Sequence, residues 1–460
     1  MSRLIIVSNR VAMVTEGKTA TGGLAVAVLA ALRETGGIWF GWSGELTAAP
    51  DSRPKVFQTG NLTYATVSLN EQDYEQYYNG FANSTLWPLF HYRLDQMSYN
   101  RSDLAGYLRV NSKFASNLIP LLEPDDLVWI HDYHLIPMAE LLRGAGFGGR
   151  IGFFLHTPLP SYDLLVSLPC HADIIRSLCA YDVVGFQTER DLQSFRDYIV
   201  IEAGGTVAAD GSVEAYGRRL KAAAYPIGID VENVMRMAQS AMRSNALLRL
   251  RNSIGARTLL IGVDRLDYSK GLVERFEAFE RLLRNYPQNR NRATLLQIAP
   301  PTRTDIPEYN DIRRKLEEAA GHINGQYAEF DWAPIRYLNK GVQRRTLTGF
   351  FRLAQVGLVT PLRDGMNLVA KEYVAAQDPE DPGVLVLSRF AGAAQQLTEA
   401  LLVNPFDIDD MVQAMQIALD MSLDERKQRW RSMMDNVTEH DIGAWRRAFL
   451  DDLHGPAAAA

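Results

Sequence analysis

Short apolar runs rich in β-branched residues recur along this chain, and longer amphipathic stretches separate them. Runs of this length between turn-forming residues predict strands buried on both faces, and the stretches between them predict covering helices. This alternation is typical of parallel sheets in α/β domains. The expected strands are Leu4–Ser8, Trp39–Trp42, Leu127–His131, Gly152–His156, Val183–Phe186, Leu259–Val263, Ala293–Ala299, Val356–Thr360, Gly383–Ser388 and Leu401–Val403. The expected helices include Leu24–Arg33, Gly271–Asn285, Asn310–Ala319 and Leu368–Gln377.

The length of the chain predicts more than one domain. A chain of 460 residues exceeds what one ordinary hydrophobic core serves, so we expect two. Pro226 and Gly228 interrupt the chain near its middle, and a polar helical stretch follows them. We therefore expect a Rossmann-like, doubly wound domain over residues 1–225 and another over residues 226–440. The C-terminal segment at about 441–453 is amphipathic and could pack back on the first domain.

Charge and cysteine content limit the classes of partner. The formal net charge of −6 argues against nucleic acid and against an anionic membrane surface, since both favour a basic protein face. The two cysteines, Cys170 and Cys179, have a spacing that suits neither a metal site nor a disulfide framework. Neither a signal peptide nor a membrane-spanning apolar stretch is evident. We expect a cytoplasmic protein with no nucleic-acid and no membrane partner.

Polar residues follow several of the expected strands, at the edge of a parallel sheet where ligands bind. In the first half, Arg10 and the Gly22-Gly23 pair follow the first strand, Asp132 follows a later strand and His156 ends the next one. Paired glycines before a helix allow an anion to approach the backbone closely. Each position also has an ordinary structural interpretation: a surface arginine, a glycine turn, a helix cap or a buried histidine.

Two cations stand in one strand-to-helix loop of the second half. Arg265 and Lys270 precede the start of a helix, where they are placed to neutralise a diphosphate leaving group. Salt bridges to Asp264 and Asp267 are an equally ordinary alternative. Arg303 follows the next expected strand.

The strongest local signal is the segment from Thr360 to Glu372, which reads TPLRDGMNLVAKE. A strand ends, an Asp-Gly loop turns, and a helix begins near Asn367, so that backbone N–H groups at the helix start can bind phosphate. Glu372 lies one turn into that helix and leans toward its N-terminus, within reach of a ribose hydroxyl. A capped helix with a surface glutamate is the alternative, and the concentration of polar and glycine residues favours binding.

Together these segments resemble the trehalose-6-phosphate synthase family of retaining glycosyltransferases, almost from end to end. The motifs that carry the resemblance are Trp39–Gly44, Leu86–Tyr92, Trp129–His134, Arg265–Gly271 and Arg363–Glu372. The resemblance implies two facing Rossmann-like domains (the GT-B fold) with ligands in the cleft between them. It also implies synthesis of α,α-trehalose 6-phosphate from UDP-glucose and glucose 6-phosphate, with no cofactor and no metal. A homo-oligomer is expected, because such assemblies are common among enzymes.

The resemblance assigns roles residue by residue. It implies acceptor binding by Arg10, Tyr78, Trp87, Asp132 and Arg303, with the phosphate held by the two arginines and Tyr78. It implies donor binding by Gly22, Gly23, Arg265, Lys270, Asp364, Gly365, Met366, Asn367, Leu368, Val369 and Glu372. Trp87 and Thr157 are implied to select the anomer, and His156 to lie beside the donor sugar. The implied catalytic residues are Arg265, Lys270, His156 and Asp364, and no metal ligand is implied.

Two positions depart from the family's pattern. Leu159 stands near the acceptor, and Val342 stands near the donor base, which leaves the donor open among UDP-, ADP- and GDP-glucose. Other functions also fit the residues: a glucosylglycerol-phosphate synthase with glycerol 3-phosphate as acceptor, a pseudo-glycosyltransferase that joins a cyclitol through nitrogen, or a non-catalytic sugar-phosphate sensor. A nicotinamide oxidoreductase is disfavoured, because the GxGxxG fingerprint is missing.

Overall fold

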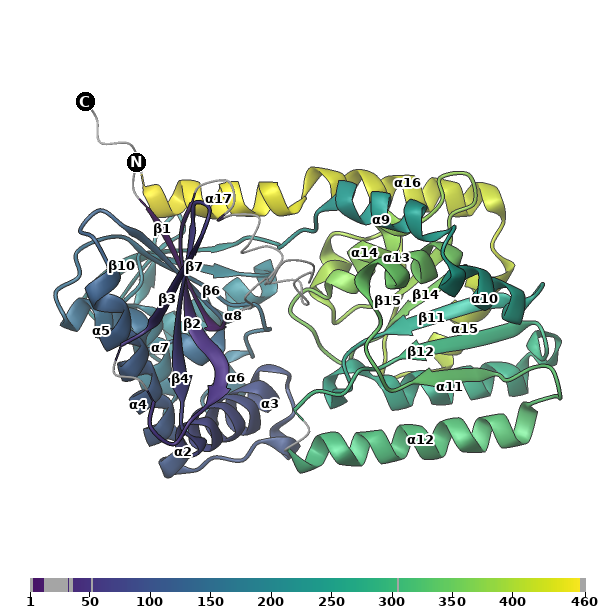
Figure 1. The fold of residues 1–460 in the computed structure, drawn as a ribbon, viewed down its shortest axis with the longest axis horizontal. Coiled ribbons are helices and arrows are strands. Elements are labelled where there is room, and N and C mark those ends of the chain that lie inside the picture. The colour runs from purple at the N-terminus through teal and green to yellow at the C-terminus, as the bar shows by residue number, and fades with distance from the viewer. Residues whose placement is uncertain (1–2, 12–31, 33–35, 51–52, 304–305, 456–460) are drawn as a thin grey trace. The chain divides into compact units, whose positions relative to one another are not determined.

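The computed structural model of the protein describes residues 3–11, 32, 36–50, 53–303 and 306–455. The chain divides into two compact units (Figure 1): unit 1 contains Met1–Pro226 and Trp445–Ala460, and unit 2 contains Ile227–Ala444. Each unit has its own β-sheet with helices packed on it. The predicted α/β class, with two sheets of mainly parallel strands, is confirmed.

The sheet of unit 1 has ten strands. In chain order they are β1 Leu4–Arg10, β2 Gly37–Leu46, β3 Lys55–Thr59, β4 Leu62–Leu69, β5 Leu127–His131, β6 Ile151–Phe154, β7 Val183–Phe186, β8 Thr206–Val207, β9 Ser212–Ala215 and β10 Arg218–Ala224. Their order across the sheet is β3-β4-β2-β1-β5-β6-β7-β10-β9-β8. The strands from β4 to β10 in that order run parallel, while β3, β9 and β8 pair antiparallel at the two edges.

The sheet of unit 2 has six strands, all of them parallel. They are β11 Thr258–Val263, β12 Ala293–Ile298, β13 Ile335–Leu338, β14 Val356–Val359, β15 Val384–Ser388 and β16 Leu401–Val403. The order across the sheet is β13-β12-β11-β14-β15-β16. This is the Rossmann arrangement, in which the first strand lies in the middle and the order reverses beside it.

Helices cover both faces of the unit 2 sheet (Figure 1). They are α9 Val231–Ala241, α10 Asn245–Ile254, α11 Leu272–Asn285, α12 Pro307–Tyr327, α13 Arg344–Leu353, α14 Leu368–Ala376, α15 Ile408–Asp420 and α16 Leu423–Glu439. Helix α11 packs with α12 and α15, whereas α14 packs with α9, α13 and α16. This double cover explains why the strands of unit 2 read as continuous apolar runs.

The described helices of unit 1 are shorter on average and include one segment of unusual pitch. They are α2 Glu71–Asp73, α3 Trp87–Phe90, α4 Arg101–Leu118, α5 Met138–Gly144, α6 Tyr162–Leu165, α7 His171–Leu178, α8 Glu189–Ile201 and, from Trp445 on, α17 Ile442–His454. A π-helical segment, Tyr74–Leu86, joins α2 to α3. Among the described residues, no helix is long and apolar enough to cross a membrane.

Two glycines let helix α17 pack on the sheet of unit 1. A Cβ at Gly152 in β6 or at Gly185 in β7 would lie 2.8 or 2.9 Å from the ring of Phe449. The rings of Trp445 and Phe449 lie 4.9 and 4.6 Å from that of Trp129 in β5, measured between centroids. The amphipathic C-terminal segment therefore contributes to the core of unit 1.

All the strands expected from the sequence are present, with ends that differ by a few residues. The helix expected over Asn310–Ala319 is longer, because α12 runs from Pro307 to Tyr327. The helix expected over Leu24–Arg33 lies, apart from Leu32, outside the described residues. Six strands were not expected: β3, β4, β8, β9, β10 and β13. Three of them, β3, β8 and β13, are edge strands, and β10 carries exposed charged residues. These four therefore lack the apolar run on which the prediction rested.

Candidate active site

Each sheet reverses its strand order at one point, and such a point leaves a crevice at the carboxyl ends of the strands. In unit 2 the reversal lies between the neighbours β11 and β14. In unit 1 it lies between β1 and β5. The ends and following loops of these strands carry the predicted site residues Arg10, Asp132, Arg265, Lys270 and Asp364. Each unit therefore carries candidate site residues at its own reversal point.

Lys270 and Asp364 meet across the reversal point of unit 2. Nζ of Lys270 donates to Oδ2 of Asp364 at 2.6 Å, and the two side chains are only 8% and 16% exposed. Nδ2 of Asn367 donates to the same oxygen at 3.0 Å. The ion-pair partner of Lys270 is therefore Asp364, and not Asp264 or Asp267, the partners of the structural alternative.

The start of α14 presents backbone N–H groups beside this ion pair. Asn367 stands before the helix with a left-handed backbone, φ 70° and ψ 83°, and its side chain does not cap the helix. Within the described residues, the N–H groups from Gly365 to Val369 donate no hydrogen bond to a loop or a side chain. Unused N–H groups and the positive end of the helix dipole together favour an anion. The predicted donor residues Gly365, Met366, Asn367, Leu368 and Val369 all belong to this segment.

A buried charge network supports the loop that carries Lys270. Arg275 of α11 is fully buried and donates to Asp264 and Gln297 at 2.8 Å each and to Thr360 at 3.0 Å. These partners stand at the ends of β11, β12 and β14, so one side chain joins three strand ends. Burial raises the pKa of Asp264, and the neighbouring cations Arg275 and Lys270 oppose that rise. Removal of the cation would leave a buried carboxylate without compensation.

Glu372 has a partner that the sequence did not suggest. Nη2 of Arg344, in α13, donates to Oε1 of Glu372 at 2.7 Å. Burial raises the pKa of Glu372, and the charge and hydrogen bond of Arg344 oppose the rise. Val342, the departure near the donor base, lies two residues before Arg344. No local signal marks Arg344, since it starts a helix where an arginine is usually exposed.

The other two predicted arginines of unit 2 differ in exposure. Arg265 is exposed in the loop after β11. Arg303 has a side chain only 5% exposed, with Nη1 3.4 Å from Oδ2 of Asp267 and bonded to the hydroxyl of Tyr309. Asp267 thus anchors Arg303 and, through its other oxygen, accepts from N of Ser269 at 2.9 Å.

In unit 1, Arg10 ends β1 and lies over the ring of Trp42, with its Cζ 5.6 Å from the ring centroid. Tyr78 lies against the same indole, at 6.1 Å between centroids, and comes from the π-helical segment Tyr74–Leu86. A Cβ at Gly44, which has φ 89°, would lie 2.5 Å from the guanidinium of Arg10. Glycine at this position leaves room for an exposed cation supported by aromatic rings.

Asp132 and His156 tie two neighbouring strand ends together. Oδ1 of Asp132, after β5, accepts from the backbone N of His156, after β6, at 3.3 Å. Nε2 of His156 lies 3.1 Å from Nδ1 of His131. Burial lowers the pKa of His156 to about 3 and the pKa of His131 well below its usual value. The sequence singled out His156 but gave no role to His131, which stands on a buried strand.

The two residues expected to select the anomer are both buried in unit 1. Trp87 begins α3 and is 4% exposed, with its ring centroid 3.9 Å from that of His91. Thr157 is 5% exposed, and its hydroxyl has no hydrogen-bond partner in the described part of the chain. Leu159, the departure near the acceptor, is buried, and its N–H donates to Oδ1 of Asp191 at 3.0 Å.

Backbone strain coincides with the predicted site. Asp132, Arg303 and Asn367 have φ of 77°, 47° and 70°, a region that residues other than glycine seldom adopt. Such strain persists where the surroundings enforce it and often marks functional positions. Gly22 and Gly23, predicted for the donor diphosphate, lie outside the described residues.

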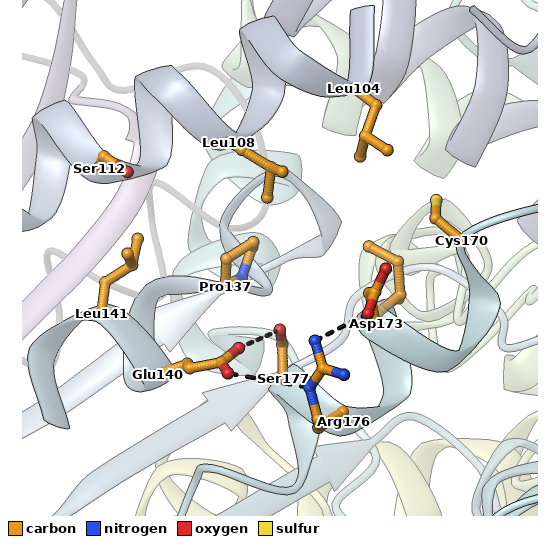
Figure 2. A pocket seen from close by; sticks show the side chains of 11 residues that line it. Leu104, Leu108, Ser112, Pro137, Glu140, Leu141, Cys170, Asp173, Arg176 and Ser177 are labelled. Carbon is orange, nitrogen blue, oxygen red and sulfur yellow. Dashed lines mark hydrogen bonds and ion pairs between the residues drawn. The ribbon is translucent and has the colours of Figure 1, made fainter. Parts of the chain in front are cut away.

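A separate cavity of about 360 Å³ lies in unit 1 among α4, α5 and α7 (Figure 2). Leucines 104, 108 and 141 form its apolar wall, and Glu140, Ser177 and Arg176 hold one another at its edge. None of the predicted site residues lines it. Among the described residues, no group of three or more His, Cys, Asp or Glu side chains is arranged to hold a metal ion.

The comparisons with known proteins agree with one another. The sequence model of glycosyltransferase family 20 matches residues 3–455. A trehalose-6-phosphate synthase of Sinorhizobium fredii is 53% identical over 98% of each chain. The solved structure of a UDP-forming α,α-trehalose-phosphate synthase from Burkholderia xenovorans, in complex with glucose 6-phosphate, is similar with a TM-score of 0.95, at 54% identity, covering 98% of this chain and all of that one. A structure from E. coli bound with UDP-2-fluoro glucose also has a TM-score of 0.95, at 48% identity, covering 99% of this chain and all of that one.

Proposed function

Since this chain belongs to glycosyltransferase family 20, we propose that it makes α,α-trehalose 6-phosphate by moving the glucosyl group of UDP-glucose to glucose 6-phosphate, with retention of configuration. Relatives that carry the name trehalose-6-phosphate synthase support the activity, and two similar structures hold glucose 6-phosphate and a UDP-glucose analogue. The single observation that carries the proposal in this chain is the pairing of Lys270 with Asp364 beside the start of α14.

Unit 2 binds the donor in this proposal. The diphosphate lies against the backbone N–H groups from Gly365 to Val369, where the helix start favours an anion. Lys270 turns from Asp364 to the diphosphate when the donor binds, and Asp364 then accepts from hydroxyls of the glucose. Glu372 accepts from the ribose hydroxyls, held in place by Arg344.

The chemical step requires charge stabilisation of the departing UDP. Arg265 and Lys270 supply two cations, and the start of α14 supplies fixed dipoles. A fixed donor that acts on charge developing in the transition state contributes roughly 3–4 kcal/mol. These protein groups do the work that a metal ion does in other transferases, so we propose catalysis without a metal or cofactor.

Unit 1 binds the acceptor. Arg10 and Tyr78, both set against Trp42, suit the phosphate of glucose 6-phosphate, and Asp132 suits the hydroxyls of its sugar ring. Trp87 and Thr157 shape the wall near the reacting carbon. The role of Arg303 in phosphate binding stays a prediction; Asp267 already compensates its charge.

The acceptor hydroxyl attacks on the face from which UDP leaves, and a phosphate oxygen of the leaving group takes its proton. The C–O bond to UDP breaks and the new glycosidic bond forms on the same face of the anomeric carbon, so its configuration is retained. The cytoplasmic location and the homo-oligomer expected from the sequence remain predictions.

The test is a panel of donors and acceptors with purified protein in EDTA. UDP-, ADP- and GDP-glucose are each combined with glucose 6-phosphate or glycerol 3-phosphate, and product and nucleoside diphosphate are measured together. We expect trehalose 6-phosphate from UDP-glucose and glucose 6-phosphate, at a rate that the chelator does not change. Product formed only with glycerol 3-phosphate would contradict glucose 6-phosphate as the acceptor. A rate that falls in EDTA would contradict catalysis without a metal.

A further inference from the structure

His131 and His156 form a hydrogen-bonded pair that the proposed mechanism does not use. His131 ends β5 and is fully buried, and His156 follows the adjacent strand β6. Nδ1 of His131 lies 3.1 Å from Nε2 of His156. Because burial lowers the pKa of both rings, both are neutral near pH 7. Their hydrogen bond therefore holds a single proton, which belongs to one ring or to the other.

The two arrangements differ in which ring nitrogen of each histidine carries the proton. If His131 donates from Nδ1, its buried Nε2 is bare, and His156 carries its own proton on Nδ1. If His156 instead donates from Nε2, its Nδ1 carries no proton, and the single proton of His131 lies on the buried Nε2. In the described part of the chain, Nε2 of His131 has no hydrogen-bond partner.

The surroundings of His131 favour a bare Nε2. The indole rings of Trp129 and Trp445 lie 4.7 and 6.4 Å from the imidazole, between centroids. Their Nε1 atoms are also buried without a partner among the described residues, and an indole N–H can only donate. A proton on Nε2 of His131 would be a third buried N–H without an acceptor, and each such group costs desolvation free energy. Buried donors without a partner are also rarer in proteins than acceptors without one.

The geometry points to His131 as the residue that fixes the proton of His156 on Nδ1, so that His156 offers an N–H donor to a hydroxyl oxygen of the transferred hexose. This inference rests on the proposed function and on the place beside the donor sugar that the family resemblance implies for His156. His156 is partly exposed, and within the described residues its Nδ1 makes no hydrogen bond. His131 is thus a positioning residue that acts through His156.

The assignment removes one candidate for the general base. A ring with a proton on Nδ1, and with Nε2 occupied by His131, has no lone pair to take the proton of the acceptor hydroxyl. His156 therefore orients the hexose and does not accept the proton.

The direct test is the tautomer of His156 in the full chain labelled with ¹⁵N-histidine. Two-bond ¹H–¹⁵N correlation spectra distinguish a protonated ring nitrogen from a bare one, and H156Q identifies the signals of His156. We expect the proton on Nδ1 of His156 and on Nδ1 of His131. A proton on Nε2 of His156, or a doubly protonated ring at pH 7, overturns the inference.

Kinetic variants test the consequence for the donor. H131N keeps an amide N–H near the place of Nδ1, whereas H131F keeps an aromatic ring and removes the donor. We expect H131F to raise the KM for UDP-glucose roughly three- to ten-fold, the range of one hydrogen bond, with the KM for glucose 6-phosphate unchanged. H131N should recover most of the donor affinity. H171N, which alters a histidine bonded to Tyr198 elsewhere in unit 1, is the matched control and should change neither constant.

A merely structural role of His131 predicts a different result. H131F would then lower the Tm and alter both KM values together, and H131N would not recover the donor affinity; that outcome overturns the inference. The tautomer is read without turnover. An inactive wild-type enzyme with the predicted tautomer would contradict the proposed function alone, and an active one with the other tautomer would contradict this inference alone.

Discussion

Nζ of Lys270 lies 2.6 Å from Oδ2 of Asp364, so the loop after β11 is joined to the loop after β14 at the point where the strand order of unit 2 reverses. The two residues are 94 positions apart in the sequence. Each side chain compensates the charge of the other in a largely buried place. The pair keeps a cation ready beside the start of α14 without an unpaired buried charge.

K270A should lower kcat by roughly 10²–10³, because it removes a fixed cation from the leaving diphosphate. Asp364 keeps its hydrogen bond from Asn367, so we expect the fold to persist. The rate is measured as release of UDP, and the Tm of the variant shows whether it is still folded. K427A, which removes a lysine paired with Glu380 at the surface of unit 2, is the control and should keep the wild-type rate. A folded K270A enzyme with normal kcat would refute the leaving-group role.

E372Q should raise the KM for UDP-glucose about ten-fold with little change in kcat. The reason is that a neutral amide oxygen accepts hydrogen bonds from the ribose hydroxyls less strongly than a carboxylate does. The variant should also lose the preference of the enzyme for UDP over 2′-deoxy-UDP, measured by calorimetry. E425Q changes a surface glutamate that pairs with Arg429 and should behave as wild type. An unchanged preference in E372Q would show that Glu372 does not contact the ribose.

R275M should lower the free energy of unfolding of unit 2 by about 3–5 kcal/mol, since it leaves the buried Asp264 without its cation. Hydrogen exchange of peptides from β11 and α11 measures the loss within this unit. The double variant D264L/R275M should regain much of the stability, because both buried charges are gone. R281A, on the exposed side of α11, should cost less than about 1 kcal/mol. Equal losses in R275M and R281A would contradict the network's role.

The buried amine of Lys371 makes the free energy of unfolding depend on pH. Burial lowers the pKa of Lys371 from 10.5 to about 7, and Nζ donates to the backbone oxygen of Ile227 at 2.7 Å. Between these two pH values the unfolded chain binds a proton that the folded chain has released, so the native state gains stability as pH rises. The slope is up to about 1.4 kcal/mol per pH unit.

K371M should abolish this contribution. The difference in unfolding free energy between wild type and K371M should therefore move in favour of wild type from pH 7 to pH 10, and should be flat below pH 6. Urea unfolding at several pH values measures it. A difference independent of pH from 7 to 10 would show that Lys371 stays protonated in the folded protein.

The alternation of apolar runs predicted the parallel strands well, because strands covered on both faces leave a strong signal. It also placed Lys270 and Asp364 at strand ends, where ligands bind. It could not predict that the two side chains meet, since that depends on β14 lying beside β11 in the sheet.

Two side chains of the site, and the helical geometry that positions a predicted one, escaped prediction for physical reasons. Arg275 reads as part of the polar side of an amphipathic helix, and only the sheet order shows that it is buried. Arg344 contacts Glu372 across two helices, which no local spacing reveals. The π-helical pitch that carries Tyr78 differs from the helical period on which sequence patterns rest.

The most direct measurement of the central claim is the linkage of the product made from UDP-glucose labelled with ¹³C at the anomeric carbon. We expect NMR to show the label in an α,α-1,1 linkage to glucose 6-phosphate, in the same configuration as in the donor, with one UDP released for each product. A β linkage, transfer to a hydroxyl other than the anomeric one, or release of free glucose as the main product would contradict it.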